Sequence, residues 1–424
     1  MIKTFVLKNG IRVVMEPMVH LRTVSFGVWV GVGSAHENKE NNGISHIHEH
    51  CLFKGTKTRT AKQLADEISA IGDQLNAFTG KECTAFYGVT LTEFLPKLME
   101  LLGDMLLNST FEEEPLKKEL GVILEEIDMY DDSPEDLVHE MLQKNVWRDH
   151  PLGFLISGEK PVVAGMTKEQ LTAFMAEHYY GSNMVVSIAG NYDEALFLSD
   201  LERYFGEIPK YAATPQTDAM KQAVPVFHRC FCKREKDVEQ LYMNLAFDAV
   251  CECDDARHTM IVANAVLGGS NNSRLFQKIR EESGLAYSVY SYSSMYRAAG
   301  LFHIDVIVNP ANAMLVYRTL KDILQDFRSG EIGEQELAAL YTQLRTEMIM
   351  GSESARNRME HNAKSLLMHG RVIPLEETIR RLSGVTAKEI RLFAKRYLDM
   401  EKCSVCLVGD IEESAAKLKK YWNG

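Results

Sequence analysis

The sequence predicts an α+β protein made of two homologous domains, each of about 210 residues. Three observations support this fold class. With 424 residues, the chain is longer than a single ordinary hydrophobic core organises. A helix–strand–turn pattern occurs twice at a fixed offset. Between the two copies, the stretch 209–226 contains Pro215, Pro225 and many small or polar residues, which is typical of a linker.

The repeated pattern covers residues 166–191 and, 219 positions later, residues 385–410. Each copy reads as an amphipathic helix with a threonine cap, followed by a buried apolar strand that ends at Gly-Asn or Gly-Asp. Four pairs of matching residues carry the likeness: Thr167 and Thr386, Leu171 and Ile390, Phe174 and Phe393, Gly190 and Gly409. Chance does not readily supply the same order of elements twice at one offset.

This repeat sets the expected domain boundaries. We place the N-terminal domain at 1–215, the linker at 209–226 and the C-terminal domain at 226–424. The strand expected over residues 24–32 has its counterpart over residues 241–247. Long helices follow both strands, and this mixture of strands and helices in each half favours the α+β class.

The composition is that of an ordinary globular protein, with 46% hydrophobic and 25% charged residues. No apolar run approaches the roughly 20 residues that span a bilayer, so no membrane attachment is expected. The first ten residues read as a strand and a turn without an export signal, and we expect a cytoplasmic protein. The net charge of −12 disfavours nucleic acid; it suits solubility or an acidic cavity for basic peptides. The eight cysteines are interpreted as buried and reduced.

A candidate metal site begins in the segment 43–53, which reads as a helix. At about 100° per residue, His50 lies about 40° and Glu49 about 60° from His46, so the three side chains share one face. Two imidazoles one turn apart can bind one Zn²⁺, and a carboxylate between them can reach a water on the ion. The alternative, two core histidines, would leave Glu49 buried without a partner, which is unfavourable. His48 points away from this face and is interpreted as a core histidine.

Two histidines leave zinc short of a protein ligand, and an acidic helix expected over residues 115–130 offers candidates. The apolar stripe of this helix consists of Leu116, Leu120, Ile123 and Ile127. Glu126 lies at the edge of the stripe, Glu119 lies one heptad earlier and about 20° off the same line, and Glu125 points to solvent. We favour Glu126 as the ligand and Glu119 either as a partner of a ligand or as an auxiliary acid. Periodicity alone also allows both to be solvated residues at the edge of the helix.

Together these residues resemble the pitrilysin/insulysin family of inverted zincins, in particular its bacterial and mitochondrial processing-peptidase branch. The resemblance is carried by His46-x-x-Glu49-His50, by Cys51-Leu-Phe-Lys-Gly-Thr56 directly after it, and by Glu126, 76 residues after His50. It extends along the whole chain and implies one Zn²⁺ per chain. It also implies that each domain has a mainly antiparallel sheet flanked by helices, as in the processing-peptidase fold.

A second matching block, residues 268–289, carries Arg280 and Tyr287. In the family, an arginine and a tyrosine at this spacing assist catalysis from the second half. A fixed cation and a phenolic donor suit the binding of a substrate backbone and a developing oxyanion. Without the resemblance, Arg280 would be read as an exposed helix residue and Tyr287 as a core residue of a strand.

A third block, residues 75–84, resembles the edge strand with which substrates pair in the family. An extended peptide could add to such a strand through main-chain hydrogen bonds. Asn76, Ala77 and Phe78 are therefore the expected substrate-binding residues. The alternative is a plain strand with a turn at Gly80.

The resemblance implies a zinc-dependent endopeptidase that cleaves unfolded peptides or presequences, with Glu49 as general base. The family encloses its sites in a chamber of four homologous domains. This chain carries two, so we expect a homodimer with active sites shared between the chains. Two alternatives stay open: a non-catalytic scaffold or core subunit of a processing-peptidase-like complex, and a metallohydrolase with a non-peptide substrate. The intact ligand set with Glu49 disfavours the scaffold.

Overall fold

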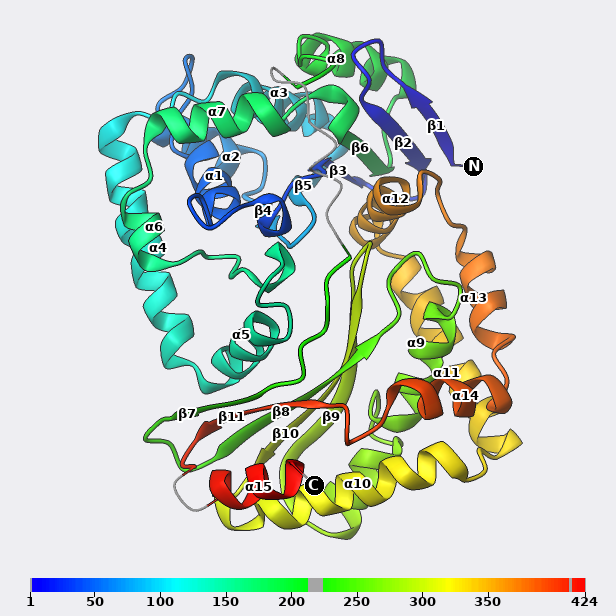
Figure 1. The fold of residues 1–424 in the computed structure, drawn as a ribbon. Coiled ribbons are helices and arrows are strands. Elements are labelled where there is room, and N and C mark those ends of the chain that lie inside the picture. The colour runs from blue at the N-terminus through cyan, green and yellow to red at the C-terminus, as the bar shows by residue number, and fades with distance from the viewer. Residues whose placement is uncertain (1, 213–223, 412–413, 424) are drawn as a thin grey trace. The chain divides into compact units, whose positions relative to one another are not determined.

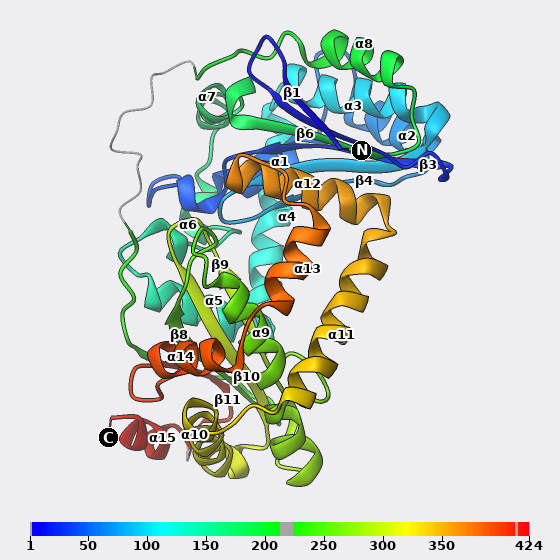
Figure 2. The same cartoon turned by 90° about the vertical axis from the view of Figure 1, so that its right-hand side faces the viewer.

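The computed structural model describes residues 2–212, 224–411 and 414–423, and Figures 1 and 2 show its elements in two views. The chain divides into two compact units, each assembled from three segments. Unit 1 comprises Met1–Ile127, Phe154–Gln222 and Ile349–Ile373, and unit 2 comprises Asp128–Gly153, Ala223–Met348 and Pro374–Gly424. Most of the expected linker, residues 213–223, lies outside the described residues.

Unit 1 is built on a six-stranded sheet in the order β1-β2-β6-β3-β5-β4. Its strands are β1 (Lys3–Val6), β2 (Arg12–Pro17), β3 (Thr23–Val30), β4 (Leu75–Thr79), β5 (Thr84–Leu91) and β6 (Met184–Gly190). All neighbouring strands pair antiparallel except β2 and β6, which are parallel. The central strands β3 and β6 are apolar and buried along nearly their whole length, because both faces of the sheet are covered.

The helices of unit 1 lie on both faces of this sheet. In Figure 2, α3 and α8 lie on one side of the sheet and α12 on the other. The helices are α1 (Ile44–Leu52), α2 (Ala61–Ala70), α3 (Leu95–Asn108), α6 (Lys160–Ala164), α7 (Lys168–His178), α8 (Glu194–Phe205) and α12 (Ala355–His369). The long helix α4 (Glu113–Asp132) begins in unit 1 and ends in unit 2.

Unit 2 repeats the plan with a five-stranded sheet in the order β7-β11-β8-β10-β9. Its strands are β7 (Phe231–Glu235), β8 (Leu241–Ala249), β9 (Ala286–Met295), β10 (Gly300–Val308) and β11 (Ser404–Gly409). Only β7 and β11 are parallel among these pairs. The expected α+β fold of two homologous domains with mainly antiparallel sheets is therefore confirmed.

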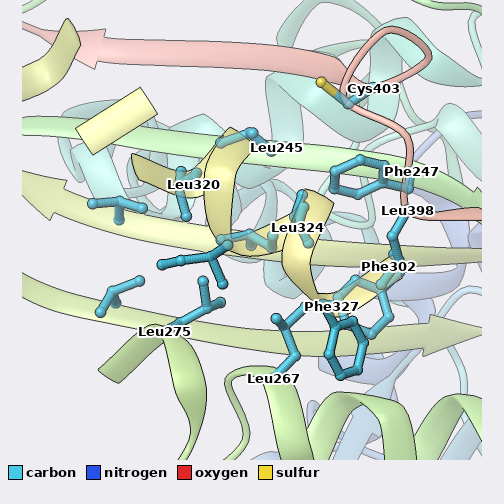
Figure 3. Close-up of a cluster of buried hydrophobic side chains, with 14 of the residues drawn as sticks. Leu245, Phe247, Leu267, Leu275, Phe302, Leu320, Leu324, Phe327, Leu398 and Cys403 are labelled. Carbon is cyan, nitrogen blue, oxygen red and sulfur yellow. The ribbon is translucent and has the colours of Figure 1, made fainter. Parts of the chain in front are cut away.

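The core of unit 2 lies between this sheet and its helices, and Figure 3 shows part of it, including Phe247, Phe302 and Phe327. The helices are α5 (Pro134–Val146), α9 (Arg257–Leu267), η6 (Phe276–Glu282), α10 (Ala313–Ser329), α13 (Leu375–Ser383), α14 (Ala387–Tyr397) and α15 (Ser414–Trp422). Helix α11 (Glu334–Ser352) belongs to unit 2 except for its last turn. Among the described residues, no helix combines the length and the apolar character that crossing a bilayer requires.

Each half of the chain contributes one helix to the unit that the other half mainly builds. Helix α5, from the first half, packs on β8 and β11 of unit 2. Helix α12, from the second half, packs on β2, β3 and β6 of unit 1. Both helices begin after a serine cap, Ser133 or Ser354, whose hydroxyl accepts a hydrogen bond from the first turn. The two helices are thus counterparts in the repeat.

The repeat extends to backbone conformation. Thr167 caps α7 and Thr386 caps α14, each in a capping box with the residue three positions later. The strands that follow, β6 and β11, end at Gly190 and Gly409, which have φ values of +130° and +131°. A Cβ atom at either glycine would lie within 2.6 Å of a backbone oxygen. Glycine is therefore required at both strand ends.

The cysteines are all free among the described residues. Cys51, Cys232, Cys403 and Cys406 are buried, as expected. Cys253 is exposed, so the expectation of a buried thiol is wrong at this position. It lies in the turn before α9, where the chain runs over the surface rather than through a strand.

Candidate metal centre

Helix α1 carries the candidate ligands, and a buried carboxylate fixes its first turn. Ile44, Ile47 and Leu52 anchor the helix in the core of unit 1. The helix begins after Gly43, at φ +99°. The carboxylate of Glu37 accepts hydrogen bonds from the backbone N–H groups of Gly43 (2.7 Å) and Ser45 (2.9 Å). This satisfies donors that the helix itself leaves unpaired and places a negative charge at the positive end of the helix dipole.

His46, His50 and Glu126 converge. The Nε2 atoms of His46 and His50 lie 3.8 Å and 3.6 Å from Oε2 of Glu126, and the ring centroids of the histidines are 4.5 Å apart. The three ligand atoms all lie within 4.8 Å of one another. In a tetrahedral zinc site with bonds of about 2.0–2.2 Å, neighbouring ligand atoms are roughly 3.3–3.6 Å apart. The donor set and its spacing therefore fit a zinc ion after a small closure.

Helix α4 supplies the third candidate ligand because its apolar stripe fixes its rotation. Leu116, Leu120, Ile123 and Ile127 are buried in the core of unit 1. Glu126 is half-buried beside this stripe, and Glu125 is exposed. The sequence-based phasing thus placed each glutamate on the correct side of the helix. The helix itself is longer than expected, because it begins at Glu113 and ends at Asp132.

Glu119 is not among the three candidate ligands, but it contacts one of them, His50. Its Oε1 lies 2.9 Å from Nδ1 of His50, and its Oε2 accepts from the ammonium group of Lys54 at 2.8 Å. An ionised carboxylate only accepts hydrogen bonds, so Nδ1 of His50 carries the hydrogen and its Nε2 is left to face Glu126. Lys54 was not among the residues predicted from the sequence, although it follows His50 by four residues, just beyond the end of α1.

The local electrostatics differ for the two histidines. Burial, together with the neighbouring His50, lowers the pKa of His46 to about 4. Burial alone would lower the pKa of His50, but the hydrogen bond to Glu119 and the negative charges of the nearby glutamates together outweigh burial and raise that pKa. Burial acts to raise the pKa of Glu119, yet the hydrogen bonds with His50 and Lys54 lower it. His46 is therefore neutral near pH 7, as a metal ligand must be.

Glu49 lies on the same helix and is held from a neighbouring strand. Burial raises the pKa of its carboxyl group. The hydroxyl of Thr79, the last residue of β4, donates a hydrogen bond of 2.5 Å to Oε2 of Glu49. A carboxylate whose pKa is raised above its ordinary value is better suited to accept and return a proton near neutral pH. Thr79 was not singled out by the sequence.

His48 lies apart from the ligands, as the helical phasing predicted. Its ring is fully buried, with centroids 4.8 Å from Phe111 and 4.7 Å from Tyr179. Burial lowers its pKa to about 3. It is a neutral packing residue beneath the site.

Comparison with known proteins places this site in a family. Residues 12–160 match the family described as insulinase (peptidase family M16), and residues 165–344 match the peptidase M16 inactive domain. A Bacillus subtilis protein named uncharacterized zinc protease YmxG is 37% identical over 408 residues, which cover 96% of this chain and 98% of the relative. The chain belongs to peptidase family M16. The resemblance to pitrilysin and insulysin read from the motifs is thereby confirmed.

Another relative and two solved structures also resemble this chain along nearly its whole length. A Streptomyces coelicolor protein, also named an uncharacterized zinc protease, is 33% identical over 414 residues, 97% of this chain and 90% of its own. The crystal structure of a protease from Helicobacter pylori has a TM-score of 0.89 at 19% identity and covers 96% of this chain and 99% of that one. A Pseudomonas fluorescens structure described as a peptidase M16 inactive domain has a TM-score of 0.87 at 19% identity, covering 96% and 98%. These two likenesses establish the fold alone.

The expected substrate strand of this M16 chain is β4, an edge of the sheet in unit 1. Within the described residues β4 pairs only with β5, from Leu75↔Gly88 to Thr79↔Thr84. Asn76 is exposed, and its Oδ1 accepts from the N–H of Ala77 at 2.8 Å. Phe78 is half-buried, with its ring 6.2 Å from that of Tyr87. The edge is thus of the kind to which an extended peptide can add.

Arg280 and Tyr287 belong to unit 2 and are not in the same unit as the metal centre. Arg280 lies on η6, exposed, with its guanidinium group 5.0 Å from the ring centroid of Phe276. Tyr287 lies on β9 and is 75% exposed. Read without the family resemblance, Tyr287 was expected to be a core residue of a strand. This expectation is wrong, because the side chain is mostly exposed. A tyrosine so exposed on a strand is available for contact with another molecule.

Proposed function

We propose that this M16 chain is a zinc-dependent endopeptidase in which His46, His50 and Glu126 bind the ion and Glu49 is the general base. The observation behind the proposal is the convergence of three ligand atoms within 4.8 Å of one another: two on α1, which also carries Glu49, and one on α4. The names of the curated relatives, zinc proteases, support the same activity.

The chemistry follows from the residues around the site. Zinc bound there would acidify a water molecule and polarise the scissile carbonyl. Glu49 accepts the proton of the attacking water and returns it to the leaving amine, for which its raised pKa is suited. Glu119 keeps His50 in the tautomer that presents Nε2. Arg280 and Tyr287 would bind the substrate backbone and the developing oxyanion.

The substrates proposed are unfolded peptides or presequences. The open edge of β4 offers main-chain donors and acceptors to an extended chain, and such pairing requires a substrate that is not folded. Asn76, Ala77 and Phe78 would form this contact. A non-peptide substrate would have no use for an open strand edge beside the site.

We propose further that the protein is a homodimer with active sites shared between chains. Each metal centre would receive Arg280 and Tyr287 of a second copy. The support is the family resemblance, which implies a chamber of four domains, together with the exposure of both residues.

The alternative is a non-catalytic scaffold or core subunit, since residues 165–344 match a domain described as inactive. That match contains none of the proposed ligands, whereas the ligands and Glu49 lie in residues 12–160, which match the insulinase description. Measuring the zinc content of the purified protein and cleavage of a library of unstructured peptides, before and after chelation, separates the two functions. We expect cleavage that chelator abolishes and zinc restores. One bound zinc without cleavage of any peptide would favour the scaffold.

A further inference from the structure

Thr79 is the last residue of the edge strand β4, and its side chain contacts the carboxylate of Glu49. Its hydroxyl oxygen lies 2.5 Å from Oε2 of Glu49 and 3.5 Å from the backbone oxygen of Ser45. The single hydroxyl hydrogen goes to the nearer acceptor, because an ionised carboxylate cannot donate in return. One oxygen of Glu49 therefore accepts from Thr79, and a water would have to be met by the other oxygen.

The position of Thr79 is fixed by the sheet rather than by the helix that carries Glu49. It pairs with Thr84 at the end of the ladder between β4 and β5. The next residue, Gly80, closes the turn with a hydrogen bond of 2.8 Å to Cys83. A side chain at such a position has little freedom, so its hydroxyl can restrict the rotamer of a glutamate that reaches it from another element.

We propose that Thr79 is a positioning residue that fixes the carboxylate of Glu49 for proton transfer; this inference rests on the proposed peptidase function. The hydrogen bond holds one oxygen of the carboxylate in place and so determines where the other oxygen points. The strand that would pair with a substrate then also sets the geometry of the general base. Thr79 is not one of the candidate ligands, and in this proposal it acts through Glu49.

The test compares Thr79→Val, which keeps the shape but removes the hydroxyl, with Thr79→Ser, which keeps the hydroxyl. For Thr79→Val, kcat should fall about 10- to 100-fold while KM and zinc content stay within twofold of wild type. Thr79→Ser should retain at least a third of the wild-type kcat. A Thr79→Val enzyme with wild-type kcat, or a Thr79→Ser enzyme as slow as Thr79→Val, would overturn the proposal.

A matched control is Thr90→Val on β5 of the same sheet. The Thr90 hydroxyl is buried and donates to the backbone oxygen of Ile71 at 2.7 Å, six residues along the strand from Thr84. This variant should lower the melting temperature without changing kcat. An equal loss of kcat in Thr90→Val would mean that losing any sheet hydroxyl impairs the enzyme, and would contradict a specific role for Thr79.

A second readout does not depend on turnover. In the metal-free protein, thermal unfolding of Thr79→Val, Glu49→Ala and the double variant forms a double-mutant cycle. We expect the double variant to melt close to Glu49→Ala alone, because the hydroxyl then has no carboxylate to hold. Additive losses would show that the contact does not exist and would overturn the proposal. If wild type cleaves no peptide but the cycle shows coupling, the peptidase function fails while the contact stands, and Thr79 has no catalytic role.

Discussion

Glu119 lies 2.9 Å from Nδ1 of His50, one heptad before Glu126 on the same helix. The two glutamates therefore lie beside different nitrogens of the same imidazole. Glu119 contacts Nδ1, and Oε2 of Glu126 lies 3.6 Å from Nε2. Such an arrangement fixes both the tautomer and the ring orientation of a metal-binding histidine.

This geometry predicts how strongly the substitution of each of three glutamates on α4 weakens zinc binding. Glu126→Gln should weaken zinc binding most, since it removes a ligand. Glu119→Gln should weaken it about 10- to 100-fold, because His50 loses its charged partner. Glu125→Gln is the matched control, exposed on the same helix, and should leave affinity unchanged. Competition with a chromogenic chelator measures the three dissociation constants; equal values for Glu125→Gln and Glu126→Gln would contradict the assignment.

The glycines that end β6 and β11 should resist substitution. Gly190→Ala and Gly409→Ala each place a Cβ in a left-handed backbone and within 2.6 Å of a backbone oxygen. Each should lower the free energy of unfolding by about 1–3 kcal/mol. Gly121→Ala, exposed within α4 and with nothing near its Cβ, should instead stabilise by roughly 0.5–1 kcal/mol. Urea denaturation gives all three values, and unchanged stability in the first two variants would refute the strain argument.

Unit 2 contains a buried acid that makes stability depend on pH. Burial raises the pKa of Asp305 to about 8. Its Oδ1 accepts from Asn244 at 2.7 Å and lies 3.5 Å from Nε2 of His139; His303 contacts Asn244, and the charge of Glu135 adds to the shift. A raised folded-state pKa means that stability is full below the ordinary value of 3.8 and declines as the pH rises toward 8.

Asp305→Asn keeps the acceptor for Asn244 and cannot ionise. Relative to this variant, wild type should lose melting temperature progressively between about pH 4 and pH 8 and no further above pH 8. Differential scanning fluorimetry at five pH values measures the gap between the melting temperatures of the two proteins. A gap between the two proteins that stays constant over this range would show that Asp305 does not titrate as its burial implies.

Shared active sites can be tested by complementation. A Glu49→Gln chain lacks the base and a Tyr287→Phe chain lacks the phenolic hydroxyl, so each homodimer should be nearly inactive. A mixture should recover up to about a quarter of wild-type activity, since half of the dimers are mixed at equal subunit exchange and one site in each mixed dimer is intact. Co-purification of two differently tagged chains measures the exchange itself. No recovery despite proven exchange would favour sites complete within one chain.

Helical periodicity was sufficient to predict which of the candidate ligands share a helix face. His46, Glu49 and His50 share a face because the α-helix has a fixed period, and the buried stripe of α4 fixes the rotation of Glu126. The repeat with offset 219 predicted two similar domains. Its matched residues Gly190 and Gly409 also share the same backbone conformation. These features depend on local geometry, which a sequence encodes directly.

The contacts that hold the site were not predictable in the same way. Glu37 reaches the start of α1 from a loop, Lys54 reaches Glu119 across two elements, and Thr79 reaches Glu49 from a strand. Each contact is set by tertiary packing between segments whose relative placement no periodicity describes. The exchange of α5 and α12 between the units has the same cause, since a repeat shows which helices correspond but not which sheet each covers.

The most direct test of the account measures zinc content and peptide cleavage in the same preparation of Glu49→Gln. Glu49 is not a ligand, so the variant should bind one zinc per chain with wild-type affinity. Without a base to accept the proton, its kcat should fall at least 1,000-fold, at the upper end of about 10²–10⁴ for general-base loss. A Glu49→Gln protein that cleaves peptides at the wild-type rate, or a wild-type protein that cleaves them with no divalent metal bound, would contradict it.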